Sequence, residues 1–288
     1  MTVSHILQPR QRDLGGGFLV RRLLPAAAAR AVGPFVFLDH FGPVVRRPAD
    51  NFDVRPHPHI GLATVSYLFE GAMLHRDSLG SVQRIEPGAI NWMTAGRGIV
   101  HSERAPPDMR SVAHRMHGLQ LWVGLPSSAE ETEPAFHHTA ADRIPACSDR
   151  GLKIRVLIGR AFGFESPVLT SSPTLYLDVE AEAGAVLDLG TEAAERAIYP
   201  VDGALQIDGA PVAAGTLAVL AAGTAAVRAQ SPSRFVVLGG APLDGPRFLW
   251  WNFVSSSKER IERAKLDWQQ QKMGTIPGET EFIPLPEA

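Results

Sequence analysis

Most of the chain consists of short runs in which hydrophobic and polar residues alternate, separated by glycine or proline. Residues 63–69, 82–85 and 118–125 are typical, because they are also rich in β-branched or large apolar side chains. The 27 glycines and 23 prolines rarely stand more than about a dozen residues apart, which is the spacing of turns in a β-sandwich or barrel. The pattern predicts an all-β protein.

The expected strands form two groups. In the first half they cover residues 18–24, a short strand within 32–43, residues 63–69, 72–77, 82–85 and 89–93, the strand that carries His101 and Glu103, and residues 118–125. In the second half they cover residues 152–158, 174–179, 185–189, 197–201, 204–207, 216–220, 225–229 and 234–238. A faint internal repeat relates the halves, because residues 201–203 and 213–219 resemble residues 69–71 and 86–92. We therefore expect two antiparallel, jelly-roll-like β-barrels built on one plan.

Two segments depart from this rhythm. Residues 126–149 are polar and acidic, and we expect a surface linker there, so that one domain covers residues 1–130 and the other residues 131–288. Near the C-terminus, Ser256 and Glu259 have the spacing of a helix capping box. A helix is predicted at about residues 257–271, with Ile261, Ala264 and Trp268 on its buried face.

Composition narrows the functional classes. The net charge of −2 gives no basic surface for nucleic acid, and the single cysteine, Cys147, fits a reducing compartment. The N-terminus lacks the pattern of a signal peptide, and no apolar run is long enough to span a membrane. We expect a cytoplasmic protein that binds neither nucleic acid directly nor membranes.

The chemistry that the sequence offers lies between residues 55 and 103. His57 and His59 stand one residue apart, as do His101 and Glu103. Alternate residues of a β-strand point to the same face, and the prolines at 56 and 58 keep the first pair extended. If the two strands are neighbours, three imidazoles and one carboxylate converge. The alternative is that these are ordinary surface residues at the ends of strands.

Such a mixed nitrogen and oxygen set suits Fe, Mn, Ni, Cu or Zn, and it disfavours Ca and Mg. All ten histidines occur at or before His138, so the second half has none. If there are two barrels, only the first is expected to hold a metal.

Other histidines are open to simpler interpretations. His75 by parity can face the barrel interior and contact the site or a substrate, but we favour packing or an ordinary hydrogen bond, and His40 is similar. We expect the remaining pairs to be solvated, namely His114 with His117 and His137 with His138. The sequence contains no GxSxG, no glycine-rich phosphate loop and no CxxC motif.

The residues around these ligands resemble the pirins, a family within the cupin superfamily. The resemblance is dense over residues 18–126 and is carried by residues 56–67, 75–80, 87–88, 91–103 and 119–126. It implies a bicupin, with one metal, usually iron, bound by the residues that match His57, His59, His101 and Glu103. The general cupin motif has a glutamate soon after the first histidine pair, where this chain has Ala63 and Thr64. Glu103 must therefore replace it.

The resemblance also implies activities. Some pirins are similar to quercetin 2,3-dioxygenases, which open a flavonol ring with O2 and release carbon monoxide. We expect a dioxygenase acting on a small aromatic, flavonol-like substrate, with Fe(II) as the first choice of metal and Glu103 as the group that takes the substrate proton. The alternative is a non-catalytic, iron-dependent redox sensor that binds a protein partner. An isomerase of sugar phosphates is disfavoured, because the segment has arginines but no lysines near the expected ligands.

Overall fold

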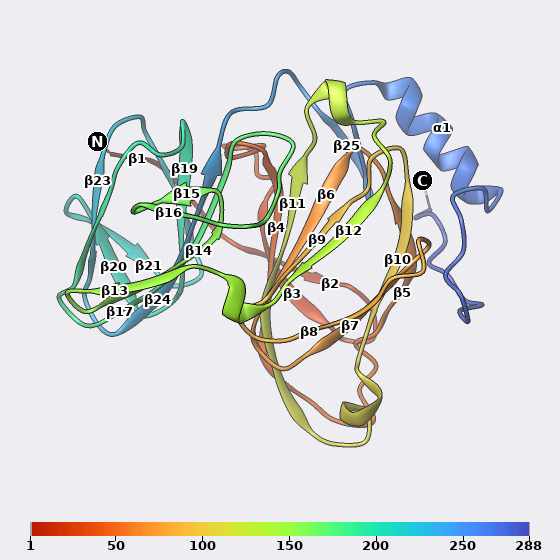
Figure 1. Cartoon of the computed structure of the whole chain (residues 1–288), viewed down its shortest axis with the longest axis horizontal. Coiled ribbons are helices and arrows are strands. Elements are labelled where there is room, and N and C mark those ends of the chain that lie inside the picture. The colour runs from red at the N-terminus through yellow and green to blue at the C-terminus, as the bar shows by residue number, and fades with distance from the viewer. Residues whose placement is uncertain (1, 288) are drawn as a thin grey trace. The chain divides into compact units, whose positions relative to one another are not determined.

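The computed structural model describes residues 2–287 and is mostly β, with a single α-helix among these residues (Figure 1). The chain forms two compact units. One comprises Met1–Gln11, Arg21–Asp39 and Asp142–Pro242, and the other comprises Arg12–Val20, His40–Ala141 and Leu243–Ala288. The prediction of an all-β chain with two antiparallel domains and a C-terminal helix is confirmed.

The unit that contains His40–Ala141, called here the histidine unit, is built on two facing sheets. The larger has the order β12 (Ala135–Thr139), β9 (Ile90–Thr94), β6 (Leu62–Glu70), β11 (His114–Gly124), β4 (Phe35–Arg46), β3 (Leu19–Leu24) and β2 (Arg10–Asp13). The smaller has the order β5 (Val54–His59), β10 (Ile99–Arg104), β7 (Met73–Asp77) and β8 (Val82–Ile85). Strands β2, β3 and β4 have residues in both units.

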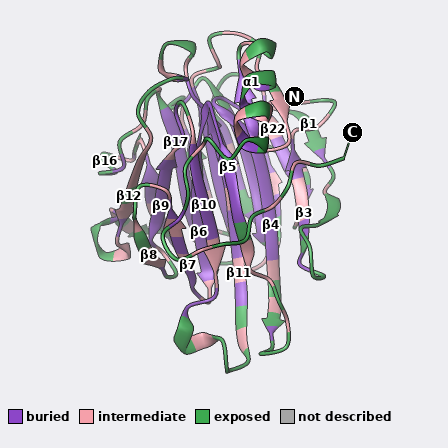
Figure 2. Ribbon diagram, turned by 90° about the vertical axis from the view of Figure 1, so that its right-hand side faces the viewer, coloured by how far each residue is buried: buried purple, intermediate pink, exposed green. Residues whose placement is uncertain are grey.

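Apolar side chains from both sheets fill part of the space between them. Phe41 and Leu68 of the larger sheet belong to the same buried cluster as Met73 and Ile85 of the smaller one. Strand β6 lies in the middle of the larger sheet and is buried on both faces from Leu62 to Phe69. Figure 2 shows this burial as purple strands with exposed green loops at their ends.

The other unit is built from a seven-stranded and a four-stranded sheet and one hairpin. The larger sheet has the order β1 (Val3–Leu7), β22 (Leu217–Leu220), β19 (Glu195–Asp202), β24 (Ser233–Gly240), β17 (Thr174–Ala181), β14 (Leu152–Ile158) and β13 (Ala146–Asp149). The smaller has β18 (Val186–Leu189), β23 (Ala225–Ala229), β20 (Ala204–Ile207) and β21 (Ala210–Ala213), and the hairpin has β15 (Arg160–Ala161) and β16 (Phe164–Glu165). Its core is a large cluster of buried aliphatic and aromatic residues that includes Val156, Leu177, Ile198 and Phe235.

Helix α1 (Lys258–Gln269) packs within the histidine unit. Ile261, Ala264 and Trp268 are buried, as predicted, in a cluster with Ile60, which follows β5, and Val100 of β10. Ser257, one residue later than expected, is the N-cap and accepts a hydrogen bond from the Arg260 amide at 3.2 Å. The hairpin β25 (Phe248–Trp250) and β26 (Phe253–Ser255) precedes the helix.

Each compact unit is assembled from separate parts of the chain, and helix α1, which we placed with the second domain, packs within the histidine unit. The boundary at residue 130 remains a prediction. The predicted linker at residues 126–149 is wrong in part, because it contains strands β12 and β13 and the 3-10 turns Ser127–Ala129 and Ala141–Arg143. Strand β12 is polar because it is a partly exposed edge strand that pairs with β9.

No helix among residues 2–287 is long and apolar enough to cross a membrane, and α1 has only 12 residues.

Candidate metal centre

Strands β5 and β10 bring three of the four predicted ligands together. They pair antiparallel, with His57 opposite His101 and His59 opposite Ile99. The ring centroid of His101 lies 4.3 Å from that of His57 and 5.0 Å from that of His59. One ligand atom from each of the three residues lies within 4.8 Å of the other two, and all three side chains are buried.

Backbone carbonyls fix which nitrogen of two of these rings carries the proton. His57 Nδ1 lies 2.8 Å from the Arg55 carbonyl oxygen, and His59 Nδ1 lies 3.1 Å from the Asn252 carbonyl oxygen. Because a carbonyl oxygen can only accept, both Nδ1 atoms must donate, and each neutral ring keeps its Nε2 lone pair free. Asn252 lies between β25 and β26, so the segment before the helix helps to orient a ligand.

The spacing of the nitrogens fits a metal ion. His59 Nε2 and His101 Nε2 are 3.1 Å apart. Two nitrogens that are each about 2.1 Å from one ion stand about 3 Å apart when they meet at a right angle. His59 offers only a lone pair at this contact, and a shared cation would satisfy it together with the lone pair of His101.

Burial keeps the three imidazoles in the form that binds metal. It lowers the pKa of His57 to about 4, against the opposing effect of the hydrogen bond to Arg55. Burial also lowers the pKa of His59 and His101 well below the usual value, and the neighbouring histidines lower them further. Neutral imidazole is the form that coordinates transition metals, so the residues present fit one divalent ion.

Glu103 is not part of the three-histidine group. The register of β10 against β5 shifts between His101 and Glu103, which stands opposite Val54. The Glu103 carboxylate lies instead 3.2 Å from the Ser66 hydroxyl, which in turn lies 2.8 Å from Gln120 Oε1. Burial raises the pKa of Glu103 to about 7, and the Ser66 hydrogen bond opposes that shift. Its role as fourth ligand remains a prediction.

His75 and Asp77 extend the site along β7, which pairs with β10 on the side away from β5. His75 Nε2 lies 2.9 Å from Asp77 Oδ2, and His75 Nδ1 lies 3.4 Å from His101 Nδ1. The Phe136 ring of β12 stacks on His75 with centroids 4.2 Å apart. His75 therefore makes the ordinary hydrogen bond that we favoured and also contacts a candidate ligand.

Sequence reasoning did not find several residues around the site. Ser66, Gln120 and Asn252 carried no motif signal, and Phe136 fell in the segment interpreted as a linker. Asp77 belongs to a segment that resembles the pirins, but no role was predicted for it. The signal that could have identified it is its spacing of two from His75 on a predicted strand, which puts both side chains on the same face.

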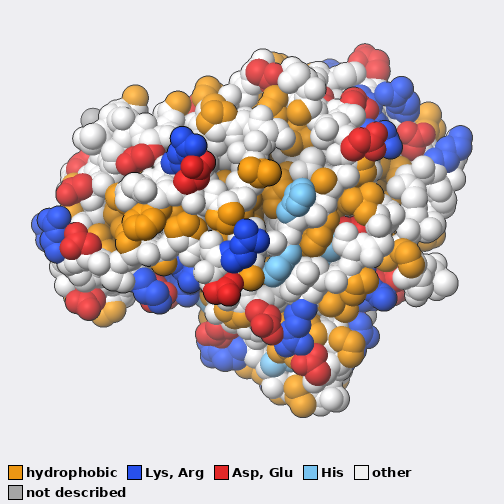
Figure 3. All heavy atoms as spheres, in the orientation of Figure 1, with side chains coloured by type: hydrophobic (Ala, Val, Ile, Leu, Met, Phe, Trp, Pro, Cys, Tyr) orange, Lys and Arg blue, Asp and Glu red, His pale blue; other side chains and the backbone are white. Residues whose placement is uncertain are grey.

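The other histidines are less solvated than predicted. His117 Nε2 lies 2.7 Å from Nε2 of the buried His40, and His138 Nδ1 lies 2.7 Å from Asn91 Oδ1. The prediction fails there because β11 and β12 are paired strands rather than loops. His137 is exposed, as expected, and Figure 3 shows histidine side chains at the surface where β9 and β12 lie.

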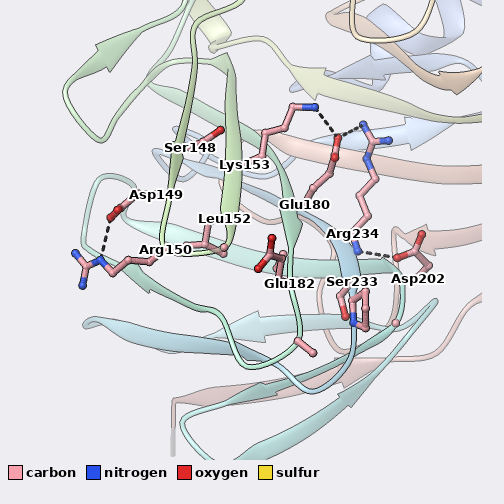
Figure 4. A pocket seen from close by; sticks show the side chains of 15 residues that line it. Ser148, Asp149, Arg150, Leu152, Lys153, Glu180, Glu182, Asp202, Ser233 and Arg234 are labelled. Atoms are coloured by element: carbon pink, nitrogen blue, oxygen red, sulfur yellow. Dashed lines mark hydrogen bonds and ion pairs between the residues drawn. The ribbon is translucent and has the colours of Figure 1, made fainter.

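A groove in the other unit offers different chemistry. It is lined by the turns after β13 and β17 and by residues near the start of β24 (Figure 4). Arg150 pairs with Asp149, Lys153 with Glu180, and the Arg234 amide donates to Asp202. No histidine lines this groove, so it cannot reproduce the centre on β5 and β10.

Comparison with known proteins agrees with the geometry. Residues 17–123 match the family model described as Pirin, and residues 176–274 match that of the Pirin C-terminal cupin domain. A pirin-like protein of Caulobacter vibrioides is 48% identical over 99% of this chain and 100% of its own length. A Pseudomonas aeruginosa protein provisionally named a quercetin 2,3-dioxygenase is 39% identical over 93% of this chain and 85% of its own length.

Among solved structures, a quercetin 2,3-dioxygenase from Acinetobacter baumannii has a TM-score of 0.91 and 33% identity, covering 99% of this chain and 95% of that one. Two cupin units, with a buried three-histidine group among the described residues of one of them, define a bicupin with a candidate metal centre. Within that class, the chain belongs to the pirin family.

Proposed function

We propose that the protein is a metal-dependent dioxygenase that uses O2 to cleave the ring of quercetin or a related phenol. The observation that carries the proposal is the buried group of His57, His59 and His101 with their neutral imidazoles. The relatives from Pseudomonas and Acinetobacter that bear the quercetin dioxygenase name support the choice of substrate class.

The three histidines would hold the ion, with Glu103 as the proposed fourth ligand. Fe(II) is our first choice, and Mn, Ni, Cu and Zn suit the same donor set. A bound metal would supply Lewis acidity toward the substrate hydroxyl and a template for its reaction with O2. The protein would contribute the buried, oriented imidazoles and an apolar wall, because Trp122 packs edge-on against His59 with centroids 5.1 Å apart.

Glu103 is our proposed acceptor of the substrate proton. Its carboxylate lies beside the Ser66 hydroxyl on the interior side of the histidine unit and two residues after His101. In the proposed reaction the hydroxyl proton would pass to Glu103 and then to the carboxylate of the product, which becomes a carboxylic acid. Both atoms of O2 enter the organic product, while one ring carbon leaves with its own oxygen as carbon monoxide.

Replacement of Glu103 tests this assignment. We expect Glu103→Gln to keep the fold and to lower quercetin-dependent O2 uptake by about 10²–10⁴-fold, the usual contribution of a positioned proton acceptor. Oxygen consumption by Fe(II)-loaded protein measures it, with Glu133→Gln on the surface as the matched control. Unchanged uptake in Glu103→Gln would remove the proton-accepting role.

Uptake that is absent from both proteins, with metal bound stoichiometrically, would end the dioxygenase proposal for quercetin. The alternative implied by the pirin resemblance, a redox-sensing regulator with a protein partner, would then take precedence.

A further inference from the structure

We propose that Asp77 and His75 are positioning residues that fix the ring tautomer of His101, so that its Nε2 lone pair faces the metal position. The inference rests on the three-histidine group being a metal site, and it holds whichever reaction the metal serves. It concerns the third imidazole, because the other two are oriented by the carbonyls of Arg55 and Asn252.

The chain of contacts begins at a turn. Asp77 ends β7, and its Oδ1 accepts hydrogen bonds from the amides of Leu79 at 2.9 Å and Ser81 at 3.0 Å. Its side chain is fully buried. Despite burial, the hydrogen bonds from His75 and Ser81 hold the pKa of Asp77 below its usual value, so the carboxylate is ionised. Only Oδ2 is left to point at His75.

The proton positions follow from donor and acceptor roles. An ionised carboxylate can only accept, so His75 Nε2 donates to Asp77 Oδ2 across 2.9 Å. With its ring proton on Nε2, His75 presents a bare Nδ1, which can only accept. His101 Nδ1, at 3.4 Å, is the donor that faces it. The proton of His101 is thereby placed on Nδ1, and Nε2 keeps the lone pair that a metal requires.

The surrounding elements hold this arrangement in place. On the paired strands β10 and β7, His101 stands opposite Asp77 and Glu103 opposite His75. Phe136 of β12 stacks on the His75 ring with an interplanar angle of 14°. The turn after β7 is thus linked through two side chains to a ligand. Groups that orient metal-bound histidines typically contribute about 10–100-fold to metal affinity.

The decisive variant is Asp77→Asn. The new side chain keeps an oxygen for the amides of Leu79 and Ser81, so its NH2 group replaces Oδ2 and donates to His75 Nε2. The His75 proton then moves to Nδ1 and forces the His101 proton onto Nε2, where the metal should bind. A carboxylate-to-amide change beside a histidine is known to impose the wrong tautomer in this way.

The test is Ni(II) titration by calorimetry at pH 8 in four proteins: the wild type, Asp77→Asn, His75→Phe and the double variant. We expect a loss of affinity of about 100-fold for Asp77→Asn and about 10-fold for His75→Phe. In the double variant, Asp77→Asn should add nothing to His75→Phe, because no imidazole remains to transmit the wrong tautomer. Asp108→Asn, at an exposed ion pair with Arg84, is the matched control.

Equal losses from Asp77→Asn with and without His75 would overturn the proposal, because they would show that Asp77 acts through the turn. Long-range proton–nitrogen NMR of the metal-free wild type keeps the test independent of folding in the variants. A proton on His101 Nε2 would also overturn it. Because Ni(II) affinity is measured without substrate, failure here is distinct from failure of the dioxygenase proposal.

Discussion

The three candidate ligands are held by three different parts of the chain. Arg55 orients His57 from the same strand, Asn252 orients His59 from the hairpin before the helix, and His75 contacts His101 from β7. At the scale of the residue, the site is therefore defined as much by what each Nδ1 contacts as by the imidazoles themselves. Spacing of histidines in the sequence indicates the ligands but not these partners.

His101 should be indispensable for binding. Its ring centroid lies 4.3 Å from that of His57 and 5.0 Å from that of His59, and only two imidazoles would remain without it. We expect His101→Ala to lower the affinity for Ni(II) or Fe(II) by more than about 100-fold, since losing a residue that only orients a ligand already costs about 10–100-fold. Metal content after dialysis measures the effect. His137→Ala, on exposed β12, is the control and should bind like the wild type. Retention of metal by His101→Ala would contradict the ligand assignment.

At the scale of the element, helix α1 and the segment that follows it pack against strands β5 and β10 and hold them in place. Ser102 alternates with His101 and Glu103 on β10, and its hydroxyl donates to Glu279 at 2.6 Å. The Ile283 amide donates to the Pro56 carbonyl at 2.8 Å, next to His57. The inner face of these strands carries the site, and their outer face is covered by the helix and the segment that follows it.

Truncating Trp268, the largest buried side chain of helix α1, should lower the stability of the fold. Trp268 is 2% exposed, packs in the cluster with Ile60 and Val100, and donates to the Ile283 carbonyl at 3.0 Å. We expect Trp268→Ala to lower the free energy of unfolding by about 3–5 kcal/mol. Denaturant titration measures it. Leu266→Ala, on the exposed face of the same helix, should change it by less than about 0.5 kcal/mol. Equal effects would mean that the helix is not packed as described.

At the scale of the whole molecule, alternation and turn spacing were sufficient to predict the two antiparallel units, and the helix was predicted from its cap and apolar face. They were insufficient for strand β12, because an edge strand with polar side chains lacks the hydrophobic alternation of a buried one. Alternation and turn spacing also could not predict which strands the helix packs against, because the partners of Trp268 lie about 170–210 residues earlier in the chain, at Ile60 and Val100.

The candidate site also contains residues that local sequence patterns predict and residues that they do not. The period of two along a strand brought His57, His59 and His101 together in the prediction, and the structure agrees. It also placed Glu103 with them, but the register shift between β5 and β10 lies beyond any single-strand pattern. Contacts such as those of Asp77 and Asn252 depend on turn geometry and on distant pairing, which local sequence does not encode.

The two units should differ in metal content. All ten histidines precede residue 139, and the core of the unit that contains residues 142–242 is a cluster of apolar side chains. We therefore propose that one metal, held on β5 and β10, supports ring cleavage by O2. The most direct measurement is carbon monoxide release from quercetin in air by metal-free protein reloaded with Fe(II), beside His101→Ala. We predict one Fe(II) per chain, one carbon monoxide per quercetin consumed, and none from the variant. A wild-type protein that binds one Fe(II) and releases none, or a variant that releases as much as the wild type, would contradict it.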